Sequence, residues 1–280
     1  MKLSKNHPVQ APLPKPQSGP SQDRAIPEED SRRIGPSDRL SLASGILQNP
    51  ERVSPPASSL LTQAFASAKG VALDLVSGLL LVDVPEPVPE SLAESIGRRE
   101  LADMKDEYGV NQDPQSAKRL NQAVLLAKKA LSPDLEVNEV VVLDTDLEHG
   151  CCTPDGSILV SKGLMDVLTD KELLFVVGHE IGHLLREDDA QRLSFEKELT
   201  PHRGEDGEIE SLRGKLLERK MEQFFHQAEF ASDEFGVKAF QENREGREAG
   251  VSYFFSRPLG AVTPTHPADS SRISRIATGD

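Results

Sequence analysis

The 280-residue sequence contains no tryptophan, two tyrosines and two cysteines. Aromatic residues make up 4% of the chain and apolar residues 37%, which is low for a protein that packs along its whole length. We therefore expect part of the chain to lie outside the folded core. The cysteines, Cys151 and Cys152, are neighbours, so they cannot form a disulfide framework, and the protein suits a reducing compartment or needs no covalent cross-links.

Long apolar runs are also missing. The longest one, residues 71–84, contains two aspartates and is shorter than the roughly 20 residues that cross a bilayer. It fits a buried helix or strand, and the negative charges nearby argue against a helix on a membrane surface. The basic N-terminus is not followed by an apolar core, so we expect no standard signal peptide. A cytoplasmic protein without an integral membrane segment is the expectation, with non-classical export left open.

An excess of positive charge is absent as well. The chain has 46 acidic and 32 basic residues, which gives a net charge of −14. Such a protein repels polyanions, so we expect no nucleic-acid partner.

The distribution of proline divides the chain. Ten of the twenty prolines precede residue 57, among Ser, Gln, Gly and charged residues. Such a segment cannot bury enough apolar surface to offset its ordering entropy, so residues 1–57 are predicted to be a disordered tail. Residues 58–134 show helical spacing and are predicted to form a helical cap or regulatory segment, ahead of a main domain over residues 135–280.

Within these last two segments, apolar spacing predicts mainly helices with a small sheet. Apolar residues at positions 120, 124, 127 and 131 share one face of a helix over residues 116–131. Two compact runs, residues 139–144 and 157–161, predict buried strands on either side of a turn at residues 153–156. Helices are also predicted over residues 163–168, 171–188, 208–241 and 269–276, whereas the charged stretch 187–204, which contains Pro201, is predicted to be a loop. The predicted fold class is therefore α+β.

The strongest chemical signal is the pentapeptide HEIGH, which begins at His179. Residues four apart on a helix project from nearly the same face, so His179 and His183 can bind one zinc ion, and Glu180 can reach a water on that metal. The surrounding helix is apolar almost all round, which gives no packing reason to hold these polar residues in its middle. The pattern therefore predicts a zinc site.

A catalytic zinc needs a third protein ligand. The metzincin solution is excluded, because Arg186 and Asp189 occupy the positions of its Gly and His. A Glu on a later helix is the other common solution, and Glu229 and Asp233, four apart, share one helix face. Glu229 could bind the metal and Asp233 could accept the free N–H of a histidine ligand, although a solvated acidic face explains the same spacing. His226, on this face too, is a competing ligand or a substrate contact.

The chain also contains Thr265-His266-Pro267 and, further on, Arg272-Ile273. With these motifs the sequence resembles the gluzincin zinc peptidases, a family that includes HtpX and the CAAX-prenyl endopeptidases. The resemblance covers roughly residues 135–276, about half of the chain. It implies a mainly helical, zincin-like metallopeptidase that acts on protein or peptide substrates. It also implies a set of site residues: one zinc ion bound by His179, His183 and Glu229, Glu180 as the general base, Asp233 orienting a ligand, and His266 near the scissile bond.

The resemblance extends to the segment before the zinc helix. Ile158, Leu159 and Val160 are expected to form the edge strand that lines the substrate groove. Many members of the family carry transmembrane helices, which this chain lacks, so it resembles a soluble branch. The family's Asn-Ala pair is replaced here by a stretch that contains Cys151 and Cys152. Since zinc accepts sulfur readily, one thiolate could occupy the fourth zinc position in a latent form, against the alternative of two ordinary buried thiols.

The expected function is a soluble zinc-dependent endopeptidase that uses metal-activated water and Glu180 as general base. Two alternatives stay open. One is a secreted effector or toxin protease that uses the tail as an export signal, and the other is a non-catalytic, chaperone-like binding protein on a peptidase scaffold. The intact Glu180 disfavours the binding protein, since a structural metal site has no use for a base.

Overall fold

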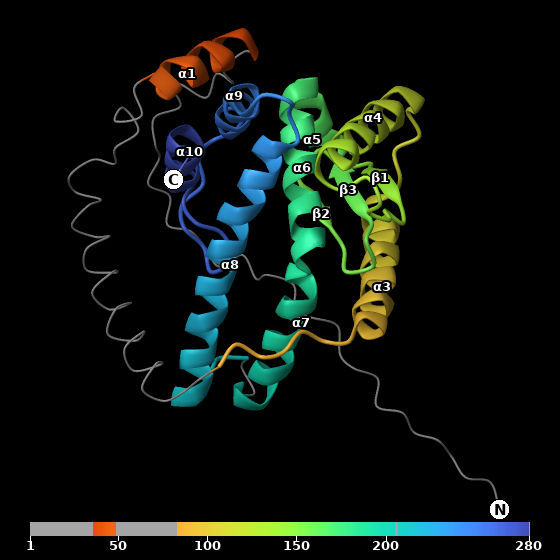
Figure 1. Ribbon diagram of the computed structural model, residues 1–280. Coiled ribbons are helices and arrows are strands. Elements are labelled where there is room, and N and C mark those ends of the chain that lie inside the picture. Colours follow the sequence, from red (N-terminus) through yellow and green to blue (C-terminus); the bar gives the residue numbers. More distant parts are fainter. Residues whose placement is uncertain (1–35, 49–82, 205–206, 280) are drawn as a thin grey trace, which may run out of the picture. The chain divides into compact units, whose positions relative to one another are not determined.

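The computed structural model of the protein describes residues 36–48, 83–204 and 207–279 (Figure 1). The described residues all belong to one compact unit. The predicted disorder of residues 1–35 and 49–57 and nearly all of the apolar run 71–84 lie outside them. The predicted division between a cap and a peptidase domain at residue 134 stays a prediction.

The described residues form mainly helices with one small sheet, which confirms the predicted α+β class. The strands are β1 (Val140–Leu143), β2 (Gly150–Cys152) and β3 (Ile158–Ser161). The helices are α1 (Pro36–Gln48), α3 (Glu90–Tyr108), α4 (Pro114–Leu131), α5 (Lys162–Val167), α6 (Asp170–Arg186), α7 (Asp188–Leu199), α8 (Leu212–Lys238), α9 (Asn243–Phe254) and α10 (Asp269–Thr278), with a 3-10 turn η2 (Thr200–His202) after α7.

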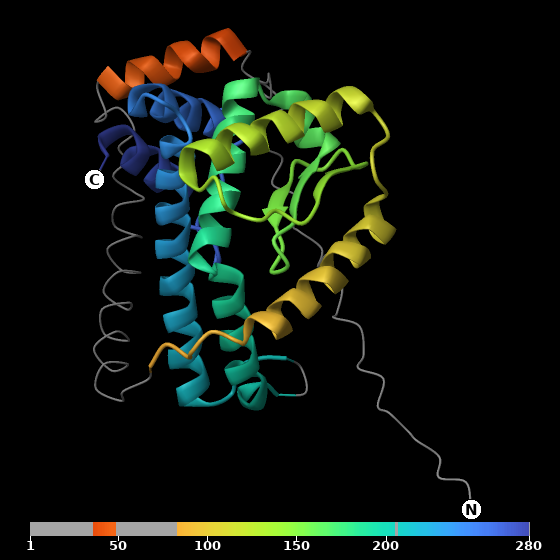
Figure 2. The ribbon, with the colours of Figure 1, turned by 45° about the vertical axis from the view of Figure 1, so that its right-hand side comes forward.

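The strand order is β1-β3-β2, with β3 parallel to β1 and antiparallel to β2. Strand β3 is therefore the middle strand, and the expectation that Ile158, Leu159 and Val160 form the edge is wrong. All three are fully buried, and β2 is the edge strand that packs on α6. A stretch of one glycine and two cysteines has little strand propensity of its own, so its extended conformation depends on pairing with β3. Helix α4 packs on α6 and β1 and crosses in front of the sheet (Figure 2).

Helix α6 begins with a capping box, in which Thr169 and Glu172 satisfy each other's backbone N–H groups. Its apolar side chains at positions 173, 175, 176, 177 and 181 are buried in the core. It ends at Glu187, which adopts a left-handed conformation with φ of 56°. The helix is thus fixed at both ends and along its length.

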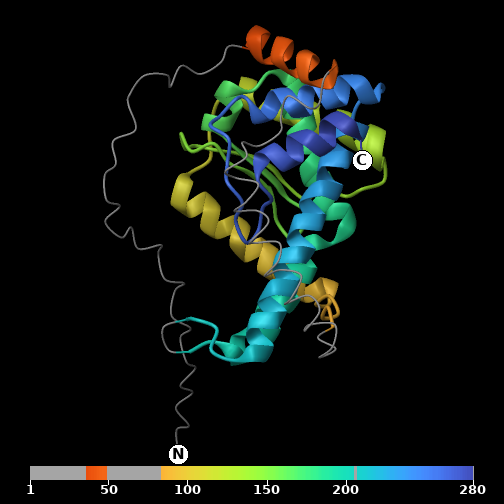
Figure 3. The same cartoon turned by 90° about the vertical axis from the view of Figure 1, so that its left-hand side faces the viewer.

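Helices α6 and α8 lie side by side (Figures 1 and 3). Glycines permit their close approach: a Cβ on Gly178 would lie 2.8 Å from the Cβ of Ala239, and one on Gly182 would lie 2.9 Å from the Cβ of Phe235. Gly182 is the fourth residue of the HEIGH pentapeptide, so the motif itself contributes to this contact. The close packing brings the middle of α8 next to the two histidines of α6.

Two predicted irregular regions contain helices. The stretch 187–204, predicted to be a loop, forms α7 because Phe195 and Leu199 pack with Ile209, Leu216 and Leu217, and Pro201 follows the helix within η2. Helix α1 lies within the predicted disordered tail.

Helix α1 is held by tertiary contacts. Ala43 is fully buried, and Arg39 donates to both oxygens of Glu172, at 3.0 and 2.9 Å. Composition averaged over 57 residues could not reveal one short docked helix. Across the described part of the chain, helices that combine the length and the apolar content for crossing a bilayer do not occur.

Candidate metal centre

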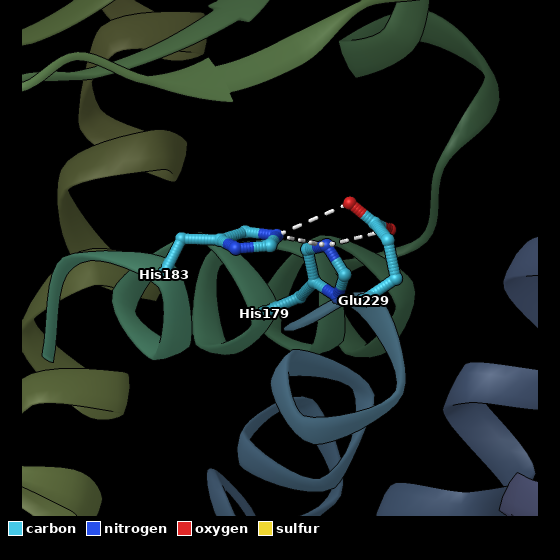
Figure 4. Close-up of side chains that lie close together, drawn as sticks. All are labelled: His179, His183 and Glu229. Atoms are coloured by element: carbon cyan, nitrogen blue, oxygen red, sulfur yellow. Dashed lines mark hydrogen bonds and ion pairs between the residues drawn. The ribbon is translucent and has the colours of Figure 1, made fainter. Parts of the chain in front are cut away.

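Three predicted metal ligands converge in the structure. His179 and His183 on α6 and Glu229 on α8 place one ligand atom each within 4.8 Å of one another (Figure 4). The two Nε2 atoms are 3.0 Å apart, and the Glu229 carboxylate oxygens lie 3.5 Å from Nε2 of His179 and 3.4 Å from Nε2 of His183. The side chains approach from two helices toward one point.

A carboxylate holds the other nitrogen of each imidazole. His179 Nδ1 lies 3.0 Å from Oδ1 of Asp233, and His183 Nδ1 lies 2.9 Å from Oδ2 of Asp188. A carboxylate only accepts hydrogen bonds, so each Nδ1 carries a proton and donates it. The neutral tautomers then direct both Nε2 lone pairs toward the cluster, the arrangement that metal-binding histidines use.

The donor set fits a zinc ion. Two lone pairs 3.0 Å apart repel each other unless a cation or a proton lies between them. Zinc–ligand bonds of about 2.0–2.1 Å in a tetrahedron give ligand atoms spaced by about 3.3 Å. The observed separations of 3.0, 3.4 and 3.5 Å lie around that value.

The electrostatics of the cluster favour a positive charge. Burial disfavours a charged imidazole at His183, but hydrogen bonds to Asp188 and Glu229 outweigh it and raise its pKa to about 10, so a metal ion that binds Nε2 must displace a proton from it. Burial likewise disfavours the charge on Glu229, yet the nearby histidines and Arg272 hold its pKa well below the ordinary value. The Glu229 carboxylate thus remains ionised and attracts a cation to the Nε2 atoms.

Arg272 on α10 connects the two carboxylates of α8. Its Nη1 lies 2.8 Å from Oε2 of Glu229, and its Nε and Nη2 lie 2.8 and 2.6 Å from the two oxygens of Asp233. All three side chains are buried. The guanidinium fixes both carboxylates in place and keeps the pKa of Asp233 below its ordinary value despite burial.

A hollow of about 320 Å³ lies beside the cluster. Glu180, His179 and Glu229 form part of its wall, together with the start of β2 and the loop that carries His266. Nε2 of His266 lies 3.5 Å from Oε1 of Glu229. Burial, with Arg272 as a further cause, lowers the pKa of His266, so the ring is neutral at neutral pH.

The other candidate ligands do not join the three-residue cluster. Nε2 of His226 lies 2.8 Å from the Thr263 carbonyl and takes no part in the cluster. Cys151 contacts Met104, with 4.0 Å between the sulfurs, and Cys152 faces Asp189, with 3.8 Å from Sγ to Oδ2. Neither thiol joins a metal-binding group among the described residues, so the latent-thiolate hypothesis gains no support.

Sequence reasoning missed two contributors to the cluster. Asp188 follows the left-handed Glu187, which turns the chain so that a residue five positions after His183 reaches back to its ring. Helical spacing does not predict that contact, because the helix has already ended. Arg272 was predicted only as part of a family motif. The need of two buried carboxylates, Glu229 and Asp233, for a cationic partner was the one signal that could have pointed to it.

Residues 114–201 match peptidase family M48, a family of metallopeptidases. The match includes His179, Glu180 and His183 and ends before α8. No curated protein matches the chain closely enough to count as a relative. The match to peptidase family M48 over residues 114–201 confirms the resemblance read from the motifs.

Proposed function

We propose that the protein is a zinc-dependent endopeptidase whose metal ligands are His179, His183 and Glu229. The observation that carries this proposal is the convergence of two Nε2 atoms and one carboxylate at separations of 3.0–3.5 Å, next to a hollow lined by Glu180. A zinc ion held there would act as a Lewis acid on the scissile carbonyl and would lower the pKa of water, so that a nucleophile is available at neutral pH.

Each residue around the cluster has a separate task in this proposal. Glu180 takes the proton of the attacking water on its carboxylate and returns it to the leaving amine. Asp233 and Asp188 hold the Nδ1–H groups of His179 and His183, so that both rings keep their orientation.

His266 would donate a hydrogen bond to the carbonyl oxygen as negative charge develops on it. Thr265 Oγ1 lies 2.8 Å from Nδ1 of His266. If the hydroxyl donates to Nδ1, the ring proton resides on Nε2, the atom that faces Glu229. A neutral ring with that proton is a suitable oxyanion donor.

The substrate backbone would pair with β2 instead of β3. Strand β3 pairs on both sides, whereas β2 is an edge strand whose first residue, Gly150, lines the hollow. An extended peptide that adds to this edge would be read mainly through its backbone, as in other cases of β-augmentation. Protein or peptide substrates with an accessible extended segment are therefore expected.

Cleavage of unfolded casein tests the proposal. The purified protein should contain about one zinc per chain and cleave casein, and a chelator should abolish cleavage until zinc is restored. Glu180→Gln should keep zinc but lose activity by orders of magnitude, whereas Glu234→Gln, on the exposed face of α8, should not change activity.

Two outcomes would contradict the proposal. Full activity in Glu180→Gln would exclude the assigned base. Zinc-loaded wild-type protein that binds casein without cutting it would favour the chaperone-like alternative.

A further inference from the structure

The loop of residues 255–268 joins α9 to α10 and carries His266 to the metal centre. One set of contacts fixes it to α10: the backbone N–H of Asp269 donates to Gly260 O at 3.1 Å, and Gly260 N–H donates to Oδ2 of Asp269 at 2.6 Å. These bonds hold the loop near its beginning and at its end. They do not determine how the segment between them lies relative to α8.

A hydrogen bond from α8 meets that segment. Nε2 of His226 lies 2.8 Å from Thr263 O, and since a carbonyl only accepts, Nε2 carries the proton and donates it. The proton leaves this nitrogen without a lone pair for a metal. His226 precedes Glu229 by three residues, so both side chains lie on one face of α8.

Thr263 and His266 form a single turn. Thr263 N–H donates to His266 O at 2.9 Å, and His266 N–H donates to Thr263 Oγ1 at 3.0 Å. Because the two residues bond to each other in both directions, a shift of the Thr263 carbonyl moves His266 with it.

We propose that His226 is a positioning residue for the peptidase reaction. By holding Thr263 O, it fixes the turn that presents Nε2 of His266 to the metal centre. Because the same helix supplies Glu229, this hydrogen bond fixes the position of His266 with respect to a metal ligand. The inference rests on the proposed endopeptidase function.

Three variants test the positioning role. His226→Phe keeps an aromatic ring and removes the donor, whereas His226→Gln keeps an N–H donor of similar reach. His202→Phe is the matched control, because His202 lies before the other end of α8 and contacts Ser211, far along the helix from the loop. The measurements are zinc content, and kcat and KM on a fluorescence-quenched peptide taken from casein.

We expect His226→Phe to lower kcat about tenfold, with zinc content unchanged and KM within about twofold of the wild type. The reason is that a displaced oxyanion donor stabilises the transition state less and leaves substrate binding nearly unchanged. His226→Gln should recover most of that loss, and His202→Phe should show none. In a His266→Ala background, His226→Phe should have no further effect on kcat. Equal losses in both backgrounds, or a loss that Gln does not rescue, would overturn the proposal.

Hydrogen exchange at the amides of Thr263 and His266 separates this inference from the proposed function. Both amides should exchange about tenfold faster in His226→Phe than in the wild type, and at the wild-type rate in His226→Gln. A zinc-loaded but inactive wild type would refute the proposed endopeptidase function. The hydrogen bond from His226 to Thr263 O, here called the tether, would still be tested by this exchange. Unchanged exchange in His226→Phe would refute the tether, even in a fully active enzyme.

Discussion

Helix α6 carries two buried polar clusters, and they differ in how their acceptor atoms are used. Near the start of the helix, Glu172 is 1% exposed, and its oxygens accept from both Arg39 and Ser252. Two turns later, His179 and His183 each hold Nδ1 against an aspartate, and their Nε2 atoms lie 3.0 Å apart and face Glu229. In the first cluster, here called the closed cluster, protein donors satisfy the acceptor atoms of Glu172. In the second, the metal centre, the lone pairs of the two histidines point toward one shared position.

This difference distinguishes a structural cluster from a binding site. A buried carboxylate that is paired and hydrogen-bonded offsets its own desolvation and links neighbouring elements, since here Glu172 of α6 binds Arg39 of α1 and Ser252 of α9. A cluster whose acceptors converge without a protein donor between them gains free energy only when a cation binds. Variants at each cluster should therefore affect different quantities.

The largest effect is expected for Glu229→Gln, which replaces an anionic ligand atom with a neutral one of the same size. Zinc affinity should fall by about 10³-fold or more, and casein cleavage should disappear with it, because removing a direct ligand costs more than the 10–100-fold typical of its supporting groups. Glu234→Gln, at a side chain that is 60% exposed on the same helix, is the control. Titration with a zinc-competing dye measures both. Unchanged affinity would remove Glu229 from the ligand set.

The next largest effect is expected for Arg39→Met at the closed cluster. The substitution leaves the Glu172 carboxylate buried without its cation and should lower the free energy of unfolding by about 3–5 kcal/mol. Urea denaturation measures this loss, and zinc affinity of the folded variant should change less than about twofold. The double variant Arg39→Met/Glu172→Gln should regain at least half of the lost stability, since it removes the unpaired charge. A single variant as stable as wild type would show that α1 does not depend on this ion pair.

A smaller effect is expected when a supporting carboxylate of the metal centre is changed. Asp188→Asn weakens the hydrogen bond that orients His183 and should reduce zinc affinity by about 10–100-fold. Its neighbour Asp189 contacts Arg192 and not a histidine, so Asp189→Asn should leave zinc affinity unchanged. Equal affinities in the two variants would mean that His183 needs no carboxylate to hold its orientation.

The local part of the site was predictable from the sequence. The four-residue spacing of His179 and His183 on an apolar helix fixes their common face, and the spacing of Glu229 and Asp233 does the same on α8. The structure brings all four together. The contacts of Asp188 and Arg272 with the site could not be predicted in this way. They depend on how the chain turns at Glu187 and on where α10 packs, and neither follows from the periodicity of the sequence.

The misread regions of the fold share a cause. Strand β2, helix α7 and helix α1 have weak local signals, and each is fixed by a partner outside the element itself: β3 for β2, the start of α8 for α7, and Glu172 for α1. Tertiary contacts override propensity most easily in short elements, because few residues contribute to the local preference. Helices α4 and α10, whose apolar residues recur with helical spacing, were predicted to within two residues.

The smallest expected effect is a pH dependence that separates charge from packing at the closed cluster. Burial alone would raise the pKa of Glu172, but hydrogen bonds from Arg39 and Ser252 hold it below its ordinary value of 4.5. The ionised group therefore stabilises the wild type above about pH 4.5, and this contribution is lost as the pH falls through the folded-state pKa. In Arg39→Met, burial dominates and raises the pKa, so ionisation destabilises the folded variant as the pH rises.

The stability difference between wild type and Arg39→Met should consequently widen between pH 4 and pH 7 by about 1–2 kcal/mol, since each unit of pKa difference corresponds to about 1.4 kcal/mol. Urea denaturation at pH 4, 5, 6 and 7 measures it, with Arg39→Met/Glu172→Gln as the control, because that double variant lacks the titrating group. If the difference stays constant with pH, Arg39 stabilises the fold through its packed side chain and not through its charge. The α6 clusters would then differ in their donors alone, and only the metal centre would depend on electrostatics.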